Sequence, residues 1–240
     1  MLVSWNLHYG VNPDGGLDLE RIARSIEEQN PSIVTLQEVS RGWVLGGGTD
    51  MATWLAQRLN MRVAYAPAAD RQFGNVVLTN LPTTNITTID LPYGDGPQER
   101  SAISVDIVLP DGPLRVTSVH LQSKGEDRIP TRLDQIETLL TAQTDAPVLI
   151  IAGDFNAQPG SPEINEMTSA GLLSAQDVSG DPSALTDPSI NPVKRIDWVF
   201  GRGVSFTNTE VLSDALSSDH LPLVVTSEVD PVWRTLTLRA

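Results

Sequence analysis

Short apolar runs that border the same kinds of polar residue recur along the chain, and they constrain its fold more than any other feature. A run of four to eight apolar residues bounded by turn residues is typical of a buried strand. Six such runs meet amide, carboxylate or imidazole groups at one end: Asn6, Glu38, His120, Asp154 with Asn156, Asp197, and Asp219 with His220. We therefore expect these groups to converge at one end of a sheet structure.

Helical periodicity separates several of these runs. It predicts helices over residues 18–29, 51–59, 132–143 and 162–169, with Asp18 and Asp50 as N-caps of the first two. Strands and helices alternate irregularly, and residues 101–121 form a predicted hairpin, which favours mixed sheets in an α/β (α+β) fold. We expect one domain over residues 1–228 and a C-terminal tail over residues 229–240.

Composition excludes several classes of function. The 240 residues include no cysteine, which excludes a disulfide framework, a thiol nucleophile and zinc held by thiolates. The formal charge is −14, so nucleic acid is a disfavoured but still open partner. No run approaches the roughly 18 apolar residues of a membrane span. The first predicted strand begins at Leu2, so we expect a soluble, monomeric domain without a signal peptide; origin in a membrane-anchored or exported protein stays open.

The polar motifs, taken in order, resemble the endonuclease/exonuclease/phosphatase superfamily, whose members share a DNase I-like fold. They are Trp5-Asn6, Gln37-Glu38, Ser118-Val119-His120, Gly153-Asp154-Phe155-Asn156, Arg195-Ile196-Asp197-Trp198 and Ser218-Asp219-His220-Leu221-Pro222. The resemblance covers roughly residues 2–227 and implies a four-layer α/β/β/α sandwich, with two mixed sheets packed face to face and flanked by helices.

A narrower resemblance is to a bacterial subgroup in which this domain often follows membrane segments, as in lipid-remodelling proteins. It is carried by Glu38-Val39-Ser40-Arg41-Gly42-Trp43, Gly46-Gly47-Gly48, Trp54-Leu55 and Phe73-Gly74-Asn75.

Oxygen donors dominate the motifs, and oxygen donors suit Mg²⁺ or Mn²⁺, with Ca²⁺ as an alternative. We expect one or two ions, held by Glu38, Asn6, Asp219 and Asp154. A cation would explain Glu38 in particular, because an unpaired carboxylate at the end of a buried strand is costly.

Imidazole takes up a proton near neutral pH, so His220 is the predicted general base. The resemblance implies that Asp197 orients it. Asp154 is expected to position the nucleophile or a second ion, and Asn156 to donate to the phosphate. His120 is expected to donate to a phosphoryl oxygen from the opposite side.

Four further residues are candidate substrate contacts: His8, Asn75, Arg100 and Trp43. Three of them also have a structural alternative. His8 suits a polar turn, Arg100 suits a structural ion pair, and Trp43 suits the core.

These predictions together describe a metal-dependent phosphodiesterase or phosphatase for a small or lipid-linked phosphoester. Two alternatives stay open: a DNA or RNA nuclease that uses the same site, and a non-catalytic interaction domain that keeps the fold.

Overall fold

Twelve strands form two six-stranded sheets in the computed structural model, which describes residues 1–69, 71–94, 96–110, 112–125 and 127–230. The first sheet has the order β11-β12-β1-β2-β4-β3. Its strands are β1 Leu2–Asn6, β2 Ile33–Ser40, β3 Arg62–Ala68, β4 Phe73–Thr79, β11 Val204–Val211 and β12 Leu223–Val229. The second sheet has the order β5-β6-β7-β8-β10-β9. Its strands are β5 Thr83–Leu91, β6 Arg100–Leu109, β7 Gly112–His120, β8 Leu149–Asp154, β9 Leu173–Ser174 and β10 Asp197–Arg202.

Both sheets are mixed, and this mixture explains why the polar motifs meet. Strands β1 and β2 are parallel, as are β7 and β8, so the members of each pair end on the same side. Strand β10 is antiparallel to β8, and β12 is antiparallel to β1, so both begin where those strands end. Asp197 and His220 therefore lie at the beginning of a strand: Asp197 is the first residue of β10, and His220 comes shortly before β12.

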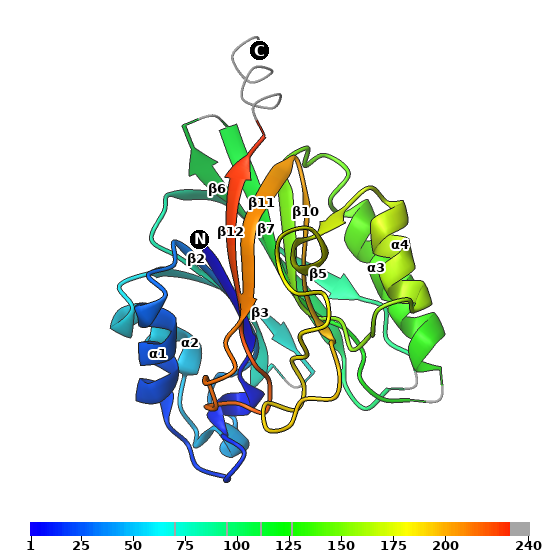
Figure 1. Cartoon of the computed structure of the whole chain (residues 1–240). Helices are drawn as coiled ribbons and strands as arrows, with labels where there is room; N and C mark the ends of the chain where they lie inside the picture. Colours follow the sequence, from blue (N-terminus) through cyan, green and yellow to red (C-terminus); the bar gives the residue numbers. More distant parts are fainter. Residues whose placement is uncertain (70, 95, 111, 126, 231–240) are drawn as a thin grey trace.

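Helices cover the outer face of each sheet, so the molecule has four layers (Figure 1). They are α1 Leu19–Glu28, α2 Met51–Arg58, α3 Arg128–Thr141, α4 Pro162–Ser169 and α5 Ala175–Ser179, with short 3-10 turns η1 His8–Gly10 and η2 Val44–Gly46. The predicted caps are confirmed, since Asp18 accepts from the Arg21 amide and Asp50 from the Thr53 amide. Helix α3 begins four residues earlier than predicted, because Pro130 fits the first helical turn.

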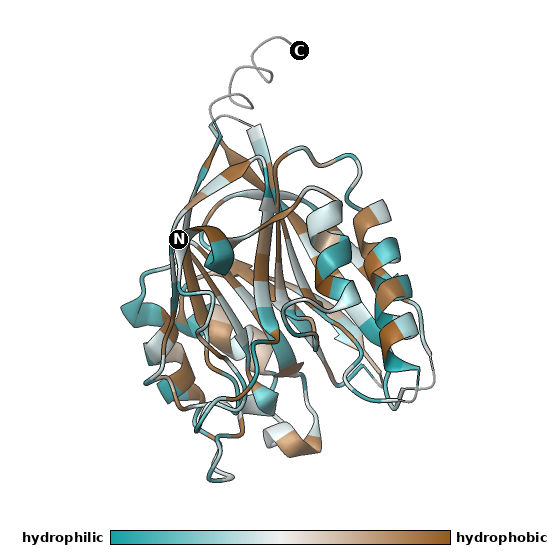
Figure 2. Ribbon diagram, turned by 45° about the vertical axis from the view of Figure 1, so that its right-hand side comes forward, coloured by the Kyte–Doolittle hydropathy of each residue, from teal (hydrophilic) through white to brown (hydrophobic). Residues whose placement is uncertain are grey.

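Three apolar clusters fill the three interfaces between the layers. Val105, Ile150 and Val225 belong to the cluster between the two sheets. Trp5, Ile22 and Leu55 belong to the cluster under α1 and α2, and Ile136, Met167 and Phe200 to the cluster under α3 and α4. In Figure 2 the helices are banded teal and brown, as expected for elements with one buried face. The predicted four-layer sandwich of two mixed sheets is confirmed.

Strand β12 runs to Val229, one residue into the predicted tail, and the Asp230 amide donates to the Gly203 carbonyl. Residues 231–240, the rest of that predicted tail, lie outside the described residues. Within the described part of the chain, no helix combines the length and the apolar character needed to cross a membrane.

Candidate active site

A cavity of about 340 Å³ opens at the end of the sandwich where β1, β7 and β8 finish. Nine of the residues singled out in the sequence line it: Asn6, His8, Glu38, Arg100, His120, Asp154, Asn156, Asp219 and His220. These residues come from both sheets, so the cavity lies across the junction between the two halves of the fold.

His220 is oriented by a chain of hydrogen bonds from β10. Its Nδ1 lies 2.8 Å from Asp197 Oδ2, and the Thr186 hydroxyl donates to the same oxygen at 2.6 Å. Asp197 is buried behind His220. Burial by itself lowers the pKa of His220, but Asp197, Asp154 and Asp219 outweigh burial and hold that pKa well above its ordinary value. The other ring nitrogen, Nε2, is left facing the carboxylates of Asp154 and Asp187, each at 3.8 Å.

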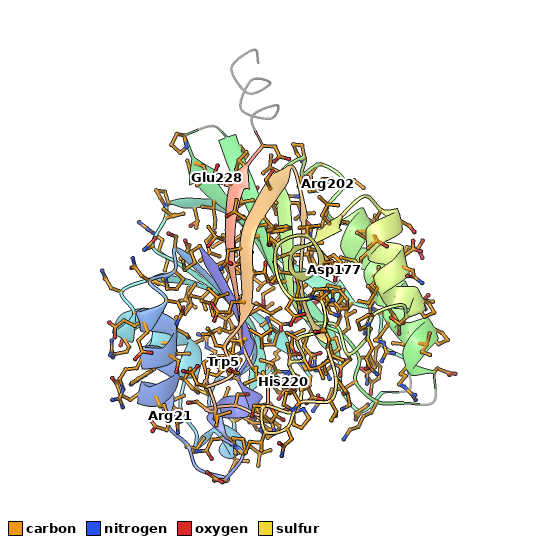
Figure 3. All side chains as sticks on the ribbon, viewed as in Figure 1. Trp5, Arg21, Asp177, Arg202, His220 and Glu228 are labelled. Atoms are coloured by element: carbon orange, nitrogen blue, oxygen red, sulfur yellow. The ribbon has the colours of Figure 1, made fainter. Side chains whose placement is uncertain are left out.

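The position of His220 depends on the first strand. The Trp5 indole N–H donates to the His220 carbonyl at 2.8 Å, and the Ser218 hydroxyl donates to the Asn6 carbonyl at 2.7 Å. Figure 3 shows Trp5 and His220 as neighbours in the lower half of the view, with Arg202 and Glu228 at the far end of the molecule. Strand β1 thus fixes the segment that carries the histidine.

Two nitrogen groups converge on the opposite wall. Asn156 Nδ2 lies 3.1 Å from His120 Nε2, and the same amide donates to the Leu121 carbonyl at 3.1 Å. Asp154 accepts from the Asn156 backbone amide at 2.8 Å, and its other oxygen lies 3.4 Å from His120 Nε2. Burial, then the charge of Arg100, lowers the pKa of His120 well below its ordinary value, so this ring is neutral.

Glu38 lies inside β2 rather than at its end, which corrects the sequence-based expectation. The β2–β4 register shifts between Leu36 and Val39, and Glu38 takes a left-handed backbone with φ of +51°. Such a bulge re-aims a side chain at a cost of roughly 1–3 kcal/mol. His8, Tyr9 and Asn156 also have positive φ and line the same cavity. Strained backbone is therefore concentrated at this site.

The carboxylates of the cavity lack sufficient positive charge. Burial raises the pKa of Glu38, and burial followed by the charge of Asp197 raises the pKa of Asp154 to about 7. A divalent cation beside these groups would supply the missing charge, and amide and carboxylate oxygens are suitable ligands for it.

Asn6 joins this set through its side chain. Its Nδ2 donates to Asp154 Oδ2 at 3.1 Å, and its Oδ1 accepts from the His8 amide at 3.1 Å. An amide oxygen has a second lone pair, so Oδ1 can also bind a cation. Asp219 lies at the mouth of the cavity, with Oδ2 3.7 Å from His8 Nδ1, and both side chains are 38% exposed.

A second group of potential ligands consists of Asp154, Asp197 and His220, whose ligand atoms lie within 4.8 Å of one another. In that group Asp197 Oδ2 and His220 Nδ1 already bind each other. A cation held by that pair would break the bond that orients the imidazole. The donor set around Glu38 is the alternative that leaves this bond intact.

Trp43 and Asn75 do not reach the open cavity. Trp43 stacks on Phe73 with ring centroids 5.1 Å apart and meets Tyr9 edge-on at 4.4 Å, so it supports a residue of the cavity wall. Asn75 is 2% exposed and donates to the Ser101 carbonyl at 2.6 Å. Both are placed to support neighbouring residues, in contrast to the predicted substrate contacts.

Several residues of the site lie outside the sequence motifs and were not predicted. Thr186 supports Asp197, and Asp187 and Lys194 form an ion pair at 2.8 Å beside His220. They belong to the loop before β10, where an isolated bridge joins residues 187 and 194. Pro188 and Pro192 mark this stretch as a loop in the sequence, but only the fold brings it to the cavity.

Solved structures with the same fold come from distant organisms. A Beutenbergia cavernae protein described as an endonuclease/exonuclease/phosphatase is 24% identical, with a TM-score of 0.81, and the match covers 95% of this chain and 71% of that one. A Bacteroides thetaiotaomicron mannosyl-6-phosphatase is 14% identical, with a TM-score of 0.76 and coverage of 95% and 98%. The human Nocturnin catalytic domain with bound sulfate is 20% identical, with a TM-score of 0.73 and coverage of 95% and 92%.

The sequence comparison reaches the same grouping independently. The profile of the Endonuclease/Exonuclease/phosphatase family matches residues 3–220, which is most of the chain and includes every strand that borders the cavity. The members of this family hydrolyse phosphoester bonds, generally with divalent metals. On this match, and on the four-layer fold that agrees with it, the chain belongs to the endonuclease/exonuclease/phosphatase family.

Proposed function

We propose that this protein is a Mg²⁺- or Mn²⁺-dependent phosphoesterase that hydrolyses a phosphodiester of a small or lipid-linked substrate. Monoesters are the nearest alternative class. The observation that carries the proposal is the His220–Asp197 pair, whose free Nε2 lies across one cavity from two converging nitrogen donors and from under-compensated carboxylates. A non-catalytic interaction domain has no need to keep such a costly arrangement intact.

In this proposal Glu38, Asn6 and Asp219 hold the cation, with Asp154 at its edge. A bound Mg²⁺ or Mn²⁺ supplies neutralisation of the charge on the phosphoryl oxygens and helps the leaving oxygen depart. Ca²⁺, which also binds oxygen donors, is the alternative ion.

His220 removes the proton from the attacking water through Nε2 once a bound cation offsets the charges of Asp154 and Asp219, which help to raise the pKa of His220 in the metal-free protein. Asp197 holds the proton on Nδ1 and stabilises the imidazolium that forms, and Thr186 holds Asp197 in place. Asp154 accepts the other hydrogen of this water, since its Oδ2 faces Nε2 at 3.8 Å.

His120 and Asn156 bind a phosphoryl oxygen. Asn156 Nδ2 and His120 Nε2 lie 3.1 Å apart, and with a proton on Nε2 both groups can donate to one acceptor placed between them. A non-bridging oxygen between them would accept from both, and the bonds would strengthen as negative charge develops there.

The surface favours a small substrate over a nucleic acid. Four basic residues with the potential to form a positive groove are divided by the fold: Lys124 and Arg128 are exposed, whereas Arg100 and Arg132 are buried. Arg132 is paired with Glu163, its Nε donating at 2.6 Å. With a formal charge of −14, the chain has few contacts for a polyanion.

A nuclease is the second candidate, because the family description includes endonucleases and exonucleases. The similar mannosyl-6-phosphatase structure favours a sugar phosphate instead. A panel assay with added Mg²⁺ or Mn²⁺ would decide between them. We expect efficient cleavage of a bis-aryl phosphodiester and only weak, low-salt nicking of plasmid DNA. Plasmid cleavage with the higher kcat/KM, persisting at about 150 mM salt, would put the nuclease first.

A further inference from the structure

Arg100 is a buried arginine whose short contacts are with neutral groups, although its charge also acts on Glu38 and Asp154 over a longer distance. It begins β6 and is 4% exposed. Its Nη1 lies 3.1 Å from His120 Nδ1, and its Nη2 donates to the Ser123 hydroxyl at 3.2 Å. No ion pair within 4.0 Å joins Arg100 to a carboxylate among the residues that the structure describes. The guanidinium is thus aimed at the imidazole.

We propose that Arg100 is a positioning residue that fixes the tautomer of His120, so that Nε2 carries the proton and points at the substrate phosphoryl group. The inference rests on the proposed function, which it deepens. It differs from the expectation that Arg100 itself contacts the substrate.

The hydrogen-bonding chemistry of the two side chains requires this tautomer of His120. A guanidinium has only donors, so Nδ1 of His120 has to accept from Nη1. A neutral imidazole has one donor and one acceptor, so the proton resides on Nε2. Glu38 Oε1 is the other group near Nδ1, and at 3.8 Å it is too distant to accept a hydrogen bond from it.

The surroundings hold both groups in place. The two residues lie on paired neighbouring strands, with Ala102 opposite Val119 in the β6–β7 register. Both are buried, at 4% and 3% exposure, so water does not compete for Nδ1. Without Arg100, His120 could carry its proton on Nδ1, and Nε2 would then present a lone pair to the phosphoryl oxygen.

The first test is spectroscopic and needs no substrate. In ¹⁵N-histidine-labelled protein, His120 should show the Nε2–H pattern, and Arg100→Met should move its two ¹⁵N resonances toward the other tautomer. Arg100→Gln, which retains an amide donor, should shift them less. A wild-type Nδ1–H pattern, or identical resonances in Arg100→Met and the wild type, would overturn the proposal even if phosphoesterase activity is found.

The second test separates positioning from substrate contact. Arg100→Met should lower kcat about 10- to 100-fold with little change in KM, a loss typical of residues that orient a functional histidine. In a His120→Ala background it should cost no more than about twofold. Losses that multiply in the double variant, or a raised KM with normal kcat, would identify Arg100 as an independent substrate contact.

Arg202→Met is the matched control. Arg202 is partly buried and donates to the carbonyls of Gln143 and Ala146, and Figure 3 places it far from His220. This variant removes an arginine that binds backbone carbonyls, and it should change neither the His120 resonances nor kcat. If Arg100→Met does not fold, Arg100→Gln and Ser123→Ala carry the same two tests.

Discussion

The β6–β7 hairpin has an arginine near each end, Arg100 buried and Arg115 partly buried, and the two arginines contact different kinds of group. At one end Arg115 donates to Asp106 at 2.7 Å and also pairs with Asp145. Burial works against the charge of Asp106, but hydrogen bonds from Arg115 and Asn85 outweigh it and lower the pKa of that carboxyl. At the other end Arg100 binds His120 and Ser123, and the pKa values of Glu38 and Asp154 are raised.

Burial raises the pKa of both carboxyl groups and is the largest single cause at each, so the other causes decide the direction. Asp106 is 7% exposed and Asp154 is 2% exposed, yet their pKa values move in opposite directions. The direction follows the partner: a guanidinium that faces a carboxylate completes a structural cluster. Where the guanidinium faces elsewhere, the carboxylates remain available for a cation and for chemistry.

Removal of divalent metal should have the largest effect, and only at the site. EDTA should abolish turnover, and Mg²⁺ or Mn²⁺ should restore it. The melting temperature should rise with added metal, by the equivalent of about 2.7 kcal/mol at 100 times the Kd. Full turnover in a sample verified as metal-free would contradict the proposed function.

The substitution His220→Ala should have the second largest effect on turnover. Loss of a general base costs about 10²–10⁴ in rate, mainly in kcat, and the fold should survive. Asp197→Asn should show a smaller defect of the same kind. Circular dichroism and the melting temperature check folding, and a folded His220→Ala variant with near-normal kcat would show that another group activates the water.

The substitution Arg115→Met should have the opposite result to His220→Ala: kcat should stay normal, and stability should fall. It leaves Asp106 buried without its charged partner, and breaking a buried pair costs about 3–5 kcal/mol. Arg115 is partly exposed, so we expect the lower end of that range. Denaturant unfolding measures the change. A stability loss below about 0.5 kcal/mol would mean that the Arg115 cluster is not structural.

Glu38→Gln should stabilise the metal-free protein while abolishing its activity. The substitution removes a buried charge that has no sufficient partner, a change worth about 1 kcal/mol. Unfolding in EDTA measures it, with the exposed Glu137→Gln as the control that should change little. A less stable Glu38→Gln protein would show that Glu38 already has an adequate partner without metal.

The smallest expected effect is that of Asp106→Asn on the pH dependence of stability. The folded pKa of Asp106 is depressed, so its contribution to stability is present above the ordinary carboxyl pKa and is lost as pH falls through the folded value. Asp106→Asn should therefore be less stable than the wild type at pH 7, and the gap in melting temperature should narrow below about pH 4. A constant gap from pH 7 to pH 2.5 would exclude this linkage.

Much of this site was visible in the sequence because local signals and chemistry agreed there. The caps Asp18 and Asp50 follow from hydrogen bonding within one turn, and the buried runs before Asn6 and Asp154 follow from hydrophobicity. The resemblance then supplied the pairing of Asp197 with His220, which spacing alone could not.

The remainder depends on contacts distant in sequence. The bulge at Glu38 arises from the register with β4, and the direction of Arg100 depends on packing against β7. Thr186 lies in a loop, and no local pattern indicates that its hydroxyl meets Asp197. The short elements β9 and α5 were missed because two and five residues are too few to establish a period.

The link between Trp5 and His220 has a consequence for protein synthesis. The chain emerges from the ribosome at about 5–20 residues per second, so about 10–40 s separate the first strand from the histidine that docks on it. During that interval β1 and β2 can pair, but the proposed general base, His220, has not yet been made. A nascent chain arrested before Asp219 should have no hydrolytic activity, so this enzyme is silent until its sandwich is nearly closed.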